Sequence, residues 1–372
     1  MNSDTLSAYK QAFFHLSYKG ILKPIFFRFD PERVHDFMVG RGVKLGSSGV
    51  TQSLVRSLFN YEHPMLEQTV CGIQFKNPMG LSAGFDKDAR LTQILPEVGF
   101  GFEEVGSITA YPCDGNPKPR LQRLPKSQSL VVYYGLKNEG ADRIHRRLSK
   151  LKFKFPVGIS IARTNIKDTA DPLLAIEDYI LSYRRFRDIG DYYTINISCP
   201  NTYGGQPFTD PALLERLLKR IAEEPRTKPV FLKISPDVSV KQLDDIISLA
   251  QEYKLCGFVC TNLTKNHHNA AIKDEVRIPG GMSGKVVAEL SVNFIRHIYR
   301  KTEGKMTIIG SGGIFNARDA YDRIKAGASL LQLITGMIYE GPQVIGEINR
   351  GLVNLLKQDN FGSINEAVGV EA

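Results

Sequence analysis

Short apolar runs alternate with amphipathic helical stretches along most of the chain after Phe75. Eight of these runs have the length and composition of buried strands. The predicted strands are Met79–Ala83, Phe102–Ser107, Val157–Ala162, Tyr192–Ile197, Val230–Ile234, Gly257–Thr261, Met306–Gly310 and Ser329–Ile334. Strands that alternate with helices form parallel sheets with right-handed crossovers, and eight such units favour closure. The pattern therefore predicts an α/β fold, a (β/α)8 TIM barrel over residues 46–372. No GxGxxG motif follows the first strand, which weighs against an open dinucleotide-binding sheet.

Residues 1–45 show a different pattern, in which aromatic and basic side chains mix on two predicted short helices. The second helix is predicted to run to about Leu45, because Asp30 is a good N-cap and Pro31 suits the first helical position. The basic residues of this segment are Lys10, Lys19, Lys23, Arg28, Arg33, Arg41 and Lys44, and its acids are Asp4, Asp30, Glu32 and Asp36. A basic, aromatic-rich helical extension is typical of a segment in the membrane interface. A helical cap that packs on the core fits the same composition, so this pattern leaves both interpretations open.

Length and charge narrow the class of protein. The 372 residues suit one barrel, typically ~250 residues, with an appendage. The net charge of +9 is compatible with anionic partners, but the sequence has no zinc finger and no Lys/Arg run of five, so we expect no nucleic-acid binding. Asp4 lies early in the chain and no uncharged run near the start reaches the ~18 residues of a membrane span, so we expect neither a signal peptide nor a transmembrane helix.

The five cysteines Cys71, Cys113, Cys199, Cys256 and Cys260 show no CxxC pair and no regular spacing. An odd number of cysteines without a framework is typical of a reducing compartment. Zinc and iron–sulfur sites need clustered thiolates, so we expect no metal site.

Glycine-rich segments follow the last two predicted strands, where barrel enzymes hold their active sites. Gly312 and Gly313 come after the seventh strand, and Thr335 and Gly336 come after the eighth. Backbone N–H groups and a helix N-terminus at such positions commonly grip a phosphate. A plain turn is the alternative, but two glycine-containing loops on neighbouring strands favour the phosphate site.

Charged and nucleophilic side chains occur at other predicted strand ends. Lys87 and Lys233 would place positive charge in the barrel mouth, where a lysine beside a flavin stabilises its anionic reduced form. The alternative is that these lysines extend into solvent from the strand ends. Cys199 lies before Pro200 in a polar loop, and a thiolate there can remove a proton from carbon. A small buried thiol is the alternative reading, which the Asn-x-x-Cys-Pro-Asn setting of Cys199 disfavours.

Six stretches resemble motifs of the dihydroorotate dehydrogenase family, in order and over nearly the whole chain. They are NPMGLSAGFDK (77–87), GFGFEEVGS (99–107), KPRLQRLP (118–125), NISCPNT (196–202), IIGSGGI (308–314) and GASLLQL (327–333). The segment FDPERVHDF (29–37) resembles the class 2, quinone-dependent members, which carry a membrane-associating helical extension. This resemblance shifts the interpretation of residues 1–45 towards membrane association and quinone access.

The resemblance also implies roles for individual residues. FMN contacts would fall on Ser82, Ala83, Gly84, Ser107, Asn196, Lys233, Thr261, Gly284, Gly312, Gly313 and Thr335. Substrate contacts would fall on Lys87, Asn196, Asn201 and Asn262. The quinone would pass near His35 and Arg123. Cys199 would be the catalytic base, which is the class 1 residue, whereas class 2 members usually have serine.

Four positions depart from the family pattern. Val132 stands where the family has an asparagine that holds the substrate ring, and Leu263 replaces a hydroxyl residue. Ser160 and Ile334 replace an asparagine and a tyrosine. Each lost hydrogen bond costs ~1–3 kcal/mol, so two could weaken orotate binding about a hundredfold.

We expect an FMN enzyme that oxidises dihydroorotate to orotate for pyrimidine biosynthesis and reduces a membrane quinone. It would be a peripheral membrane protein on the cytoplasmic face of a bacterial inner membrane. One alternative keeps the flavin and quinone but has a less polar substrate. Another is a non-catalytic FMN-binding membrane protein, against which the retained Cys199, Lys87 and Lys233 argue. The oligomeric state is left open.

Overall fold

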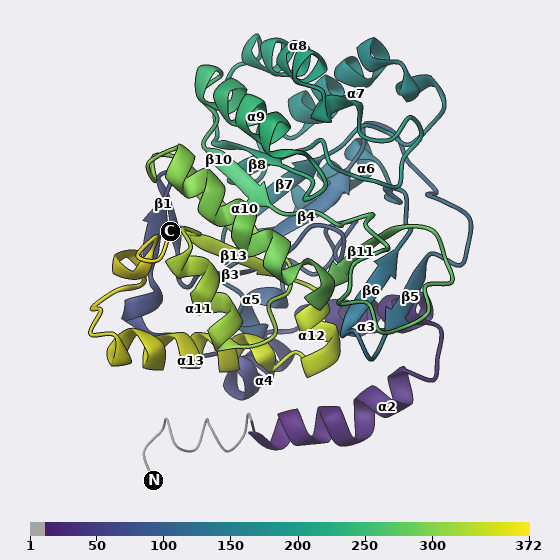
Figure 1. Ribbon diagram of the computed structural model, residues 1–372. Helices are drawn as coiled ribbons and strands as arrows, with labels where there is room; N and C mark the ends of the chain where they lie inside the picture. The colour runs from purple at the N-terminus through teal and green to yellow at the C-terminus, as the bar shows by residue number, and fades with distance from the viewer. Residues whose placement is uncertain (1–11) are drawn as a thin grey trace.

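The computed structural model describes residues 12–372 and has one closed parallel barrel of eight strands at its centre (Figure 1). The strands are β3 (Met79–Leu81), β4 (Phe102–Ile108), β7 (Val157–Ile161), β8 (Tyr192–Asn196), β9 (Val230–Lys233), β10 (Gly257–Cys260), β12 (Thr307–Ser311) and β13 (Leu330–Leu333). Their order around the ring is β10-β12-β13-β3-β4-β7-β8-β9, and β9 pairs with β10 to close it. The predicted TIM barrel is confirmed, and each predicted strand end lies within two residues of the observed one.

Helices surround the barrel, as the connections between parallel strands require (Figure 1). They are α5 (Leu95–Val98), α6 (Ala141–Leu148), α7 (Pro172–Arg185), α8 (Pro211–Ala222), α9 (Val240–Glu252), α10 (Ala288–Lys301), α11 (Ala317–Lys325), α12 (Thr335–Glu340) and α13 (Val344–Gln358). Short 3-10 turns lie at Pro64–Leu66, Asp168–Ala170, Pro207–Thr209, Lys285–Val287 and Ile364–Ala367. Local sequence explains the helix starts. Asp171 and Asp210 cap α7 and α8 ahead of a proline, and Ser239 forms a capping box with Gln242 at α9.

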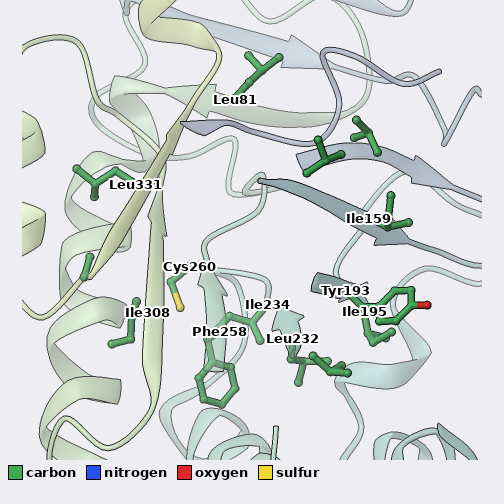
Figure 2. Packing of buried hydrophobic residues seen from close by; sticks show 14 of the residues in the cluster. Leu81, Ile159, Tyr193, Ile195, Leu232, Ile234, Phe258, Cys260, Ile308 and Leu331 are labelled. Carbon is green, nitrogen blue, oxygen red and sulfur yellow. The ribbon is translucent and has the colours of Figure 1, made fainter. Parts of the chain in front are cut away.

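Side chains alternate between the two faces of each barrel strand and build two separate apolar layers. Outward-facing residues such as Ile159, Ile195 and Leu331 pack against the helices in the main core (Figure 2). Inward-facing residues such as Phe102 and Phe231 fill the barrel near the amino-terminal ends of the strands. Buried polar residues such as Glu104, Thr194, Lys233 and Gln332 follow them towards the carboxyl ends, so the barrel is apolar at one end and polar at the other.

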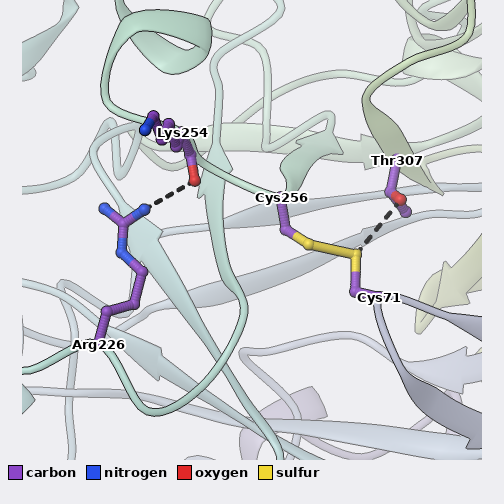
Figure 3. Close-up of a disulfide and its surroundings, with 5 residues drawn as sticks. All are labelled: Cys71, Arg226, Lys254, Cys256 and Thr307. Atoms are coloured by element: carbon purple, nitrogen blue, oxygen red, sulfur yellow. Dashed lines mark hydrogen bonds between the residues drawn. A yellow bond between two sulfur atoms is a disulfide. The ribbon is translucent and has the colours of Figure 1, made fainter.

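A hairpin closes the apolar end of the barrel and carries a disulfide bond. The hairpin consists of β1 (Gln68–Val70) and β2 (Ile73–Phe75), and Cys71 at its turn is bonded to Cys256, the residue before β10 (Figure 3). The spacing of the cysteines did not predict this bond, and a disulfide is not typical of the reducing compartment that the spacing indicated. The partners lie 185 residues apart, so their pairing depends on the folded barrel and leaves no trace in the local spacing. Cys113, Cys199 and Cys260 are free thiols.

A three-stranded antiparallel sheet lies outside the barrel and was not predicted. It has the order β11-β6-β5 and contains β5 (Leu121–Leu124), β6 (Ser129–Val132) and β11 (Gly281–Gly284). These strands come from two insertions that are far apart in the sequence. Val132 is paired with Leu121 on one side and with Gly281 on the other. This pairing holds the two insertions together.

The described part of the N-terminal extension has two helical stretches, as predicted, and a further helix follows it. Residues 12–17 are helical and continue into a π-helical turn (Tyr18–Leu22) and α2 (Lys23–Phe26); α3 (Pro31–Gly46) and α4 (Gly49–Phe59) follow. The Asp30 side chain accepts from Arg33 N at 2.9 Å, which confirms the predicted N-cap of α3. Asp4 and Lys10 lie outside the described residues. None of the helices within residues 12–372 has the length and apolarity that a membrane span requires.

A buried ion pair joins α3 to the barrel. Glu32 and Arg120 are 4% and 5% exposed, and their closest nitrogen and oxygen atoms are 2.5 Å apart. Arg120 also donates to the backbone oxygens of Asp114 and Asn116 at 2.8 and 3.3 Å. A buried pair of this kind is strongly destabilised when one partner loses its charge, because the other remains desolvated and unpaired.

We predict that Glu32→Gln lowers the free energy of unfolding by about 3 kcal/mol, measured by urea denaturation followed by circular dichroism. The matched control is Glu62→Gln, which removes a half-exposed ion pair with Arg56 and should cost less than about 1 kcal/mol. Equal losses in the two variants would show that the buried pair does not fasten α3 to the barrel.

Candidate active site

One cavity at the carboxyl ends of the barrel strands contains nearly all the predicted site residues. The cavity is lined by residues from the strand ends, from the β11-β6-β5 sheet and from α3. The predicted residues among its lining are His35, Ser82, Ala83, Gly84, Lys87, Ser107, Asn196, Cys199, Asn201, Lys233, Thr261, Asn262, Gly284, Gly312, Gly313 and Thr335. Arg123 is the predicted site residue that is not part of this lining.

A connected row of amides and hydroxyls crosses the floor of the cavity. The Asn196 amide donates to Ser107 Oγ at 2.8 Å, and Ser107 Oγ lies 2.8 Å from Ser160 Oγ. The Asn262 amide donates to Asn196 Oδ1 at 3.2 Å and to Ser198 Oγ at 2.9 Å. Because each side chain is held by its neighbour, the row presents fixed hydrogen-bonding groups rather than mobile ones.

Lys233 brings a buried positive charge to the same floor. It is 4% exposed, donates to Ser82 Oγ at 3.3 Å and lies 3.8 Å from Glu104 Oε1 inside the barrel. Glu104 Oε2 in turn accepts from Thr194 and Gln332 at 2.9 and 3.0 Å. Burial lowers the pKa of Lys233, and the Glu104 carboxylate opposes that shift. The alternative in which Lys233 extends into solvent is therefore wrong.

Lys87 supplies a second cation at the wall of the cavity. Its Nζ lies 4.1 Å from the centre of the Tyr134 ring and donates to Gly84 O at 3.5 Å. Burial lowers the pKa of Lys87 to about 8, and the carboxylates of Asp88 and Asp36 partly counter this effect. A lysine that is this poorly solvated gains much from an anionic ligand, because the ligand would restore its charge balance.

Glycine loops form the part of the cavity next to β12 and β13. Gly313 has a φ of +71°, and a Cβ there would lie 2.4 Å from Ala288 Cβ, so the loop requires glycine. Thr335 begins α12, and its hydroxyl lies 2.8 Å from that of Ser283 in β11. Exposed backbone N–H groups beside a helix start are suited to a phosphate.

Arg323 fixes this glycine loop from behind and was not predicted from the sequence. It is 3% exposed, and its guanidinium donates to the backbone oxygen of Gly312 at 2.6 and 3.0 Å. A third bond goes to Ala288 O at 3.2 Å. Burial lowers the pKa of Arg323 to about 10. One arginine among 48 basic residues carries no local signal of such a role, because its partners come from other loops.

The loop after β8 carries Cys199 and Asn201. Burial raises the pKa of the Cys199 thiol, while the Asn201 backbone N–H and the Arg163 guanidinium lower it. The Asn201 amide donates to Val132 O at 2.8 Å, but its buried Oδ1 has no hydrogen-bond partner within residues 12–372. The buried Thr261 hydroxyl also has no hydrogen-bond partner among the described residues. Unpaired buried polar atoms in a cavity are suited to a polar ligand.

The positions that depart from the family pattern lie at or next to this cavity. Val132, Leu263 and Ile334 are among its lining residues, so all three place apolar surface towards a ligand. Ser160 is fully buried and bonded to Ser107.

The two residues predicted to line the quinone path, His35 and Arg123, lie where the N-terminal extension meets the rest of the protein. His35 belongs to the extension, and Arg123 contacts it from β5. His35 on α3 lines the cavity, and its Nε2 lies 2.9 Å from Phe85 O. Arg123 on β5 donates to Phe29 O at 2.8 Å, and its guanidinium lies 4.7 Å from the centre of the Phe27 ring. Apolar residues fill the space between extension and cavity, among them Phe27, Leu121, Leu130, Val132 and Ile338.

Comparison with known proteins finds similarity over most of the chain. The family model described as dihydroorotate dehydrogenase matches residues 65–356. The dihydroorotate dehydrogenase (quinone) of Nostoc punctiforme is 38% identical, with 95% of this chain and 98% of the relative covered. The protein of the same name from Natronomonas pharaonis is 36% identical, with 94% and 98% covered. A ligand-free DHODH structure from Eimeria tenella matches with a TM-score of 0.83 at 32% identity, covering 92% of this chain and 99% of its own. The structure of DHODH in complex with ferulenol from the same organism matches with a TM-score of 0.82, also at 32% identity, and covers 92% of this chain and 96% of its own.

Proposed function

Because the chain belongs to the dihydroorotate dehydrogenase family, we propose that it catalyses the FMN-dependent oxidation of dihydroorotate to orotate and reduces a membrane quinone. The observation that carries the proposal is that the Cys199 thiol, the Lys87 cation and three asparagine amides line a single cavity. A base, a cation for a carboxylate and amides for a ring are what this substrate requires.

The residues of the cavity fit FMN. The Gly312–Gly313 loop and Thr335 would hold its phosphate, as their backbone geometry and position beside α12 suggest. A Cβ at Gly84 would meet only Ile334 Cδ1 at 3.9 Å, so a flat ring system can approach the backbone there. Ser82, Ala83, Ser107, Asn196, Lys233, Thr261 and Gly284 would complete the cofactor site. When bound, FMN would accept the hydride from C6 of the substrate and pass two electrons to the quinone.

The side chains of the cavity divide the remaining work. Lys87 would bind the substrate carboxylate, which would offset the cost of its burial. Asn196, Asn201 and Asn262 would hold the ring, with the unpaired Asn201 Oδ1 accepting from a ring N–H. The Cys199 thiolate would remove the C5 proton, and the C5–H electron pair would form the new double bond as the hydride leaves C6.

The N-terminal segment, residues 1–45, would provide membrane association and quinone access. Several of its apolar side chains are largely exposed, including Phe13 at 66%, Leu16 at 72% and Ile21 at 61%. Exposed apolar side chains beside lysines are typical of a helix that lies in the membrane interface. The quinone would enter between this segment and the apolar end of the cavity, near His35 and Arg123. This arrangement fits a peripheral protein of the cytoplasmic face of a bacterial inner membrane.

A second candidate keeps the flavin and the quinone and changes the substrate to a less polar cyclic compound. The observation that favours it is the apolar surface that Val132 and Leu263 contribute to the cavity. Both candidates require the base and the flavin, so they differ only in the ligand that reduces the enzyme.

We predict that Cys199→Ala lowers kcat for dihydroorotate by about 10²–10⁴-fold, because a positioned general base contributes that much. Quinone reduction in detergent is the assay, and bound flavin is quantified in parallel. Cys260→Ala is the matched control, because Cys260 faces away from the cavity in the main core. Turnover by Cys199→Ala close to that of the parent would contradict the assignment of the base.

We predict that KM for dihydroorotate rises as the pH is raised from 7 to 9. The pKa of Lys87 is lowered to about 8, so its positive charge is present below that pH and lost above it. The loss of the cation removes the partner of the substrate carboxylate. Lys87→Met should have a high KM that stays flat over the same range. A pH-independent KM for the parent protein would exclude Lys87 from this role.

We predict that Val132→Asn tightens orotate binding about tenfold or more, since one regained hydrogen bond is worth ~1–3 kcal/mol. Orotate titration of the flavin spectrum measures the dissociation constant. Val132→Leu, which keeps the position apolar, should give no gain. An unchanged dissociation constant for Val132→Asn would mean that the missing asparagine does not limit orotate binding.

A further inference from the structure

Arg163 is a buried arginine beside the catalytic loop, and none of the roles above uses it. It lies two residues after β7 and is 3% exposed. Its guanidinium donates to Thr169 O at 2.6 Å and to Gly205 O at 3.1 Å. Further bonds go to the Thr202 hydroxyl at 3.2 Å and to Tyr203 O. Three of these acceptors belong to residues 199–205, the loop that carries Cys199.

Arg163 holds the 199–205 loop in place through the acceptors that it contacts. Tyr203 and Gly205 offer backbone oxygens that no helix or strand pairs, so the guanidinium satisfies several of them at once. The Thr202 hydroxyl, which Arg163 contacts, lies 2.9 Å from Gly205 O and 3.4 Å from Cys199 O, and it can donate its single hydrogen to either. One planar group therefore links the segment after β7 to residues 202–205, directly after Asn201. A lysine could not make this set of bonds, because its ammonium lacks the fork geometry.

The hydrogen bonds of Arg163 go to neutral acceptors. Within residues 12–372, they all go to backbone oxygens or hydroxyls and none goes to a carboxylate. The Asp178 carboxylate interacts with Arg163 through space and offsets part of its charge. The rest of the charge acts on other groups in a poorly solvated region, where charges interact more strongly than in water. The charged and titratable groups that act on the Cys199 thiol include Arg163, Lys265, Cys113, Lys233 and Tyr179.

We propose that Arg163 is a positioning residue for Cys199: its guanidinium fixes the 199–205 loop and brings a positive charge to the surroundings of the thiol. The inference rests on the proposed role of Cys199 as the base. Fixing the loop keeps the sulfur at the cavity, and the charge favours the thiolate that proton removal needs. The pKa of the thiol is raised by burial, and Arg163 is among the groups that lower it.

The two effects are separable by alkylation of Cys199 with iodoacetamide between pH 6 and 10, quantified by mass spectrometry of the peptide. The pH midpoint of the rate reports the stability of the thiolate, and the limiting rate at high pH reports access to the loop. In Arg163→Met, we expect the midpoint to rise by about one pH unit and the limiting rate to rise severalfold. In Arg163→Lys, the midpoint should stay near the parent value while the limiting rate rises.

Two further variants keep the test decisive. Thr202→Val removes one acceptor and keeps the charge, so it should raise the limiting rate and leave the midpoint unchanged. Arg187→Met removes a half-exposed arginine that pairs with Glu224, and it should change neither quantity.

An unchanged midpoint in Arg163→Met, with the parent circular dichroism spectrum, would overturn the charge effect. If Arg163→Met does not fold, an unchanged limiting rate in both Arg163→Lys and Thr202→Val would overturn the loop effect. The measurement needs neither dihydroorotate nor a quinone, so its outcome is independent of the substrate.

Discussion

Closure of the barrel by the β9–β10 pair brings the carboxyl ends of eight parallel strands to one rim. Strand alternation then decides what the rim contains. Inward positions such as Phe102 and Phe231 are apolar near the amino-terminal ends, whereas Glu104 and Lys233 follow them towards the rim. The polar floor of the cavity is therefore a direct consequence of closure, because in an open sheet these strand ends would not face one another.

The sequence predicted best what depends on local pattern. The barrel strands follow from apolar runs between helical stretches, and the start of α3 follows from Asp30 and Pro31. Contacts between distant segments were not predictable in this way. Cys71 pairs with Cys256, and Arg163 and Arg323 hold loops that come from other parts of the chain. The pairing of β11 with β6 was missed for the same reason, since these strands come from two separate insertions.

The site combines groups suited to the proposed chemistry with an altered substrate wall. Lys87, Lys233 and Cys199 lie at one cavity, and burial shifts the pKa of each towards its neutral form. The two lysines are favourable partners for an anionic substrate and a flavin, which would restore the charge that burial disfavours. Val132 and Leu263 lie on the same cavity and offer no side-chain hydrogen bond. In the proposed reaction, the cations and amides therefore bind the polar groups of the substrate. The apolar wall determines how tightly the ring is bound.

The most direct test of the account is the flavin absorbance of the purified protein under anaerobic conditions after addition of L-dihydroorotate. The account predicts rapid bleaching of the flavin band, reversed by a soluble quinone. Flavin that stays oxidised with dihydroorotate, but is reduced by dithionite, would contradict the proposed substrate while leaving the cofactor site sound.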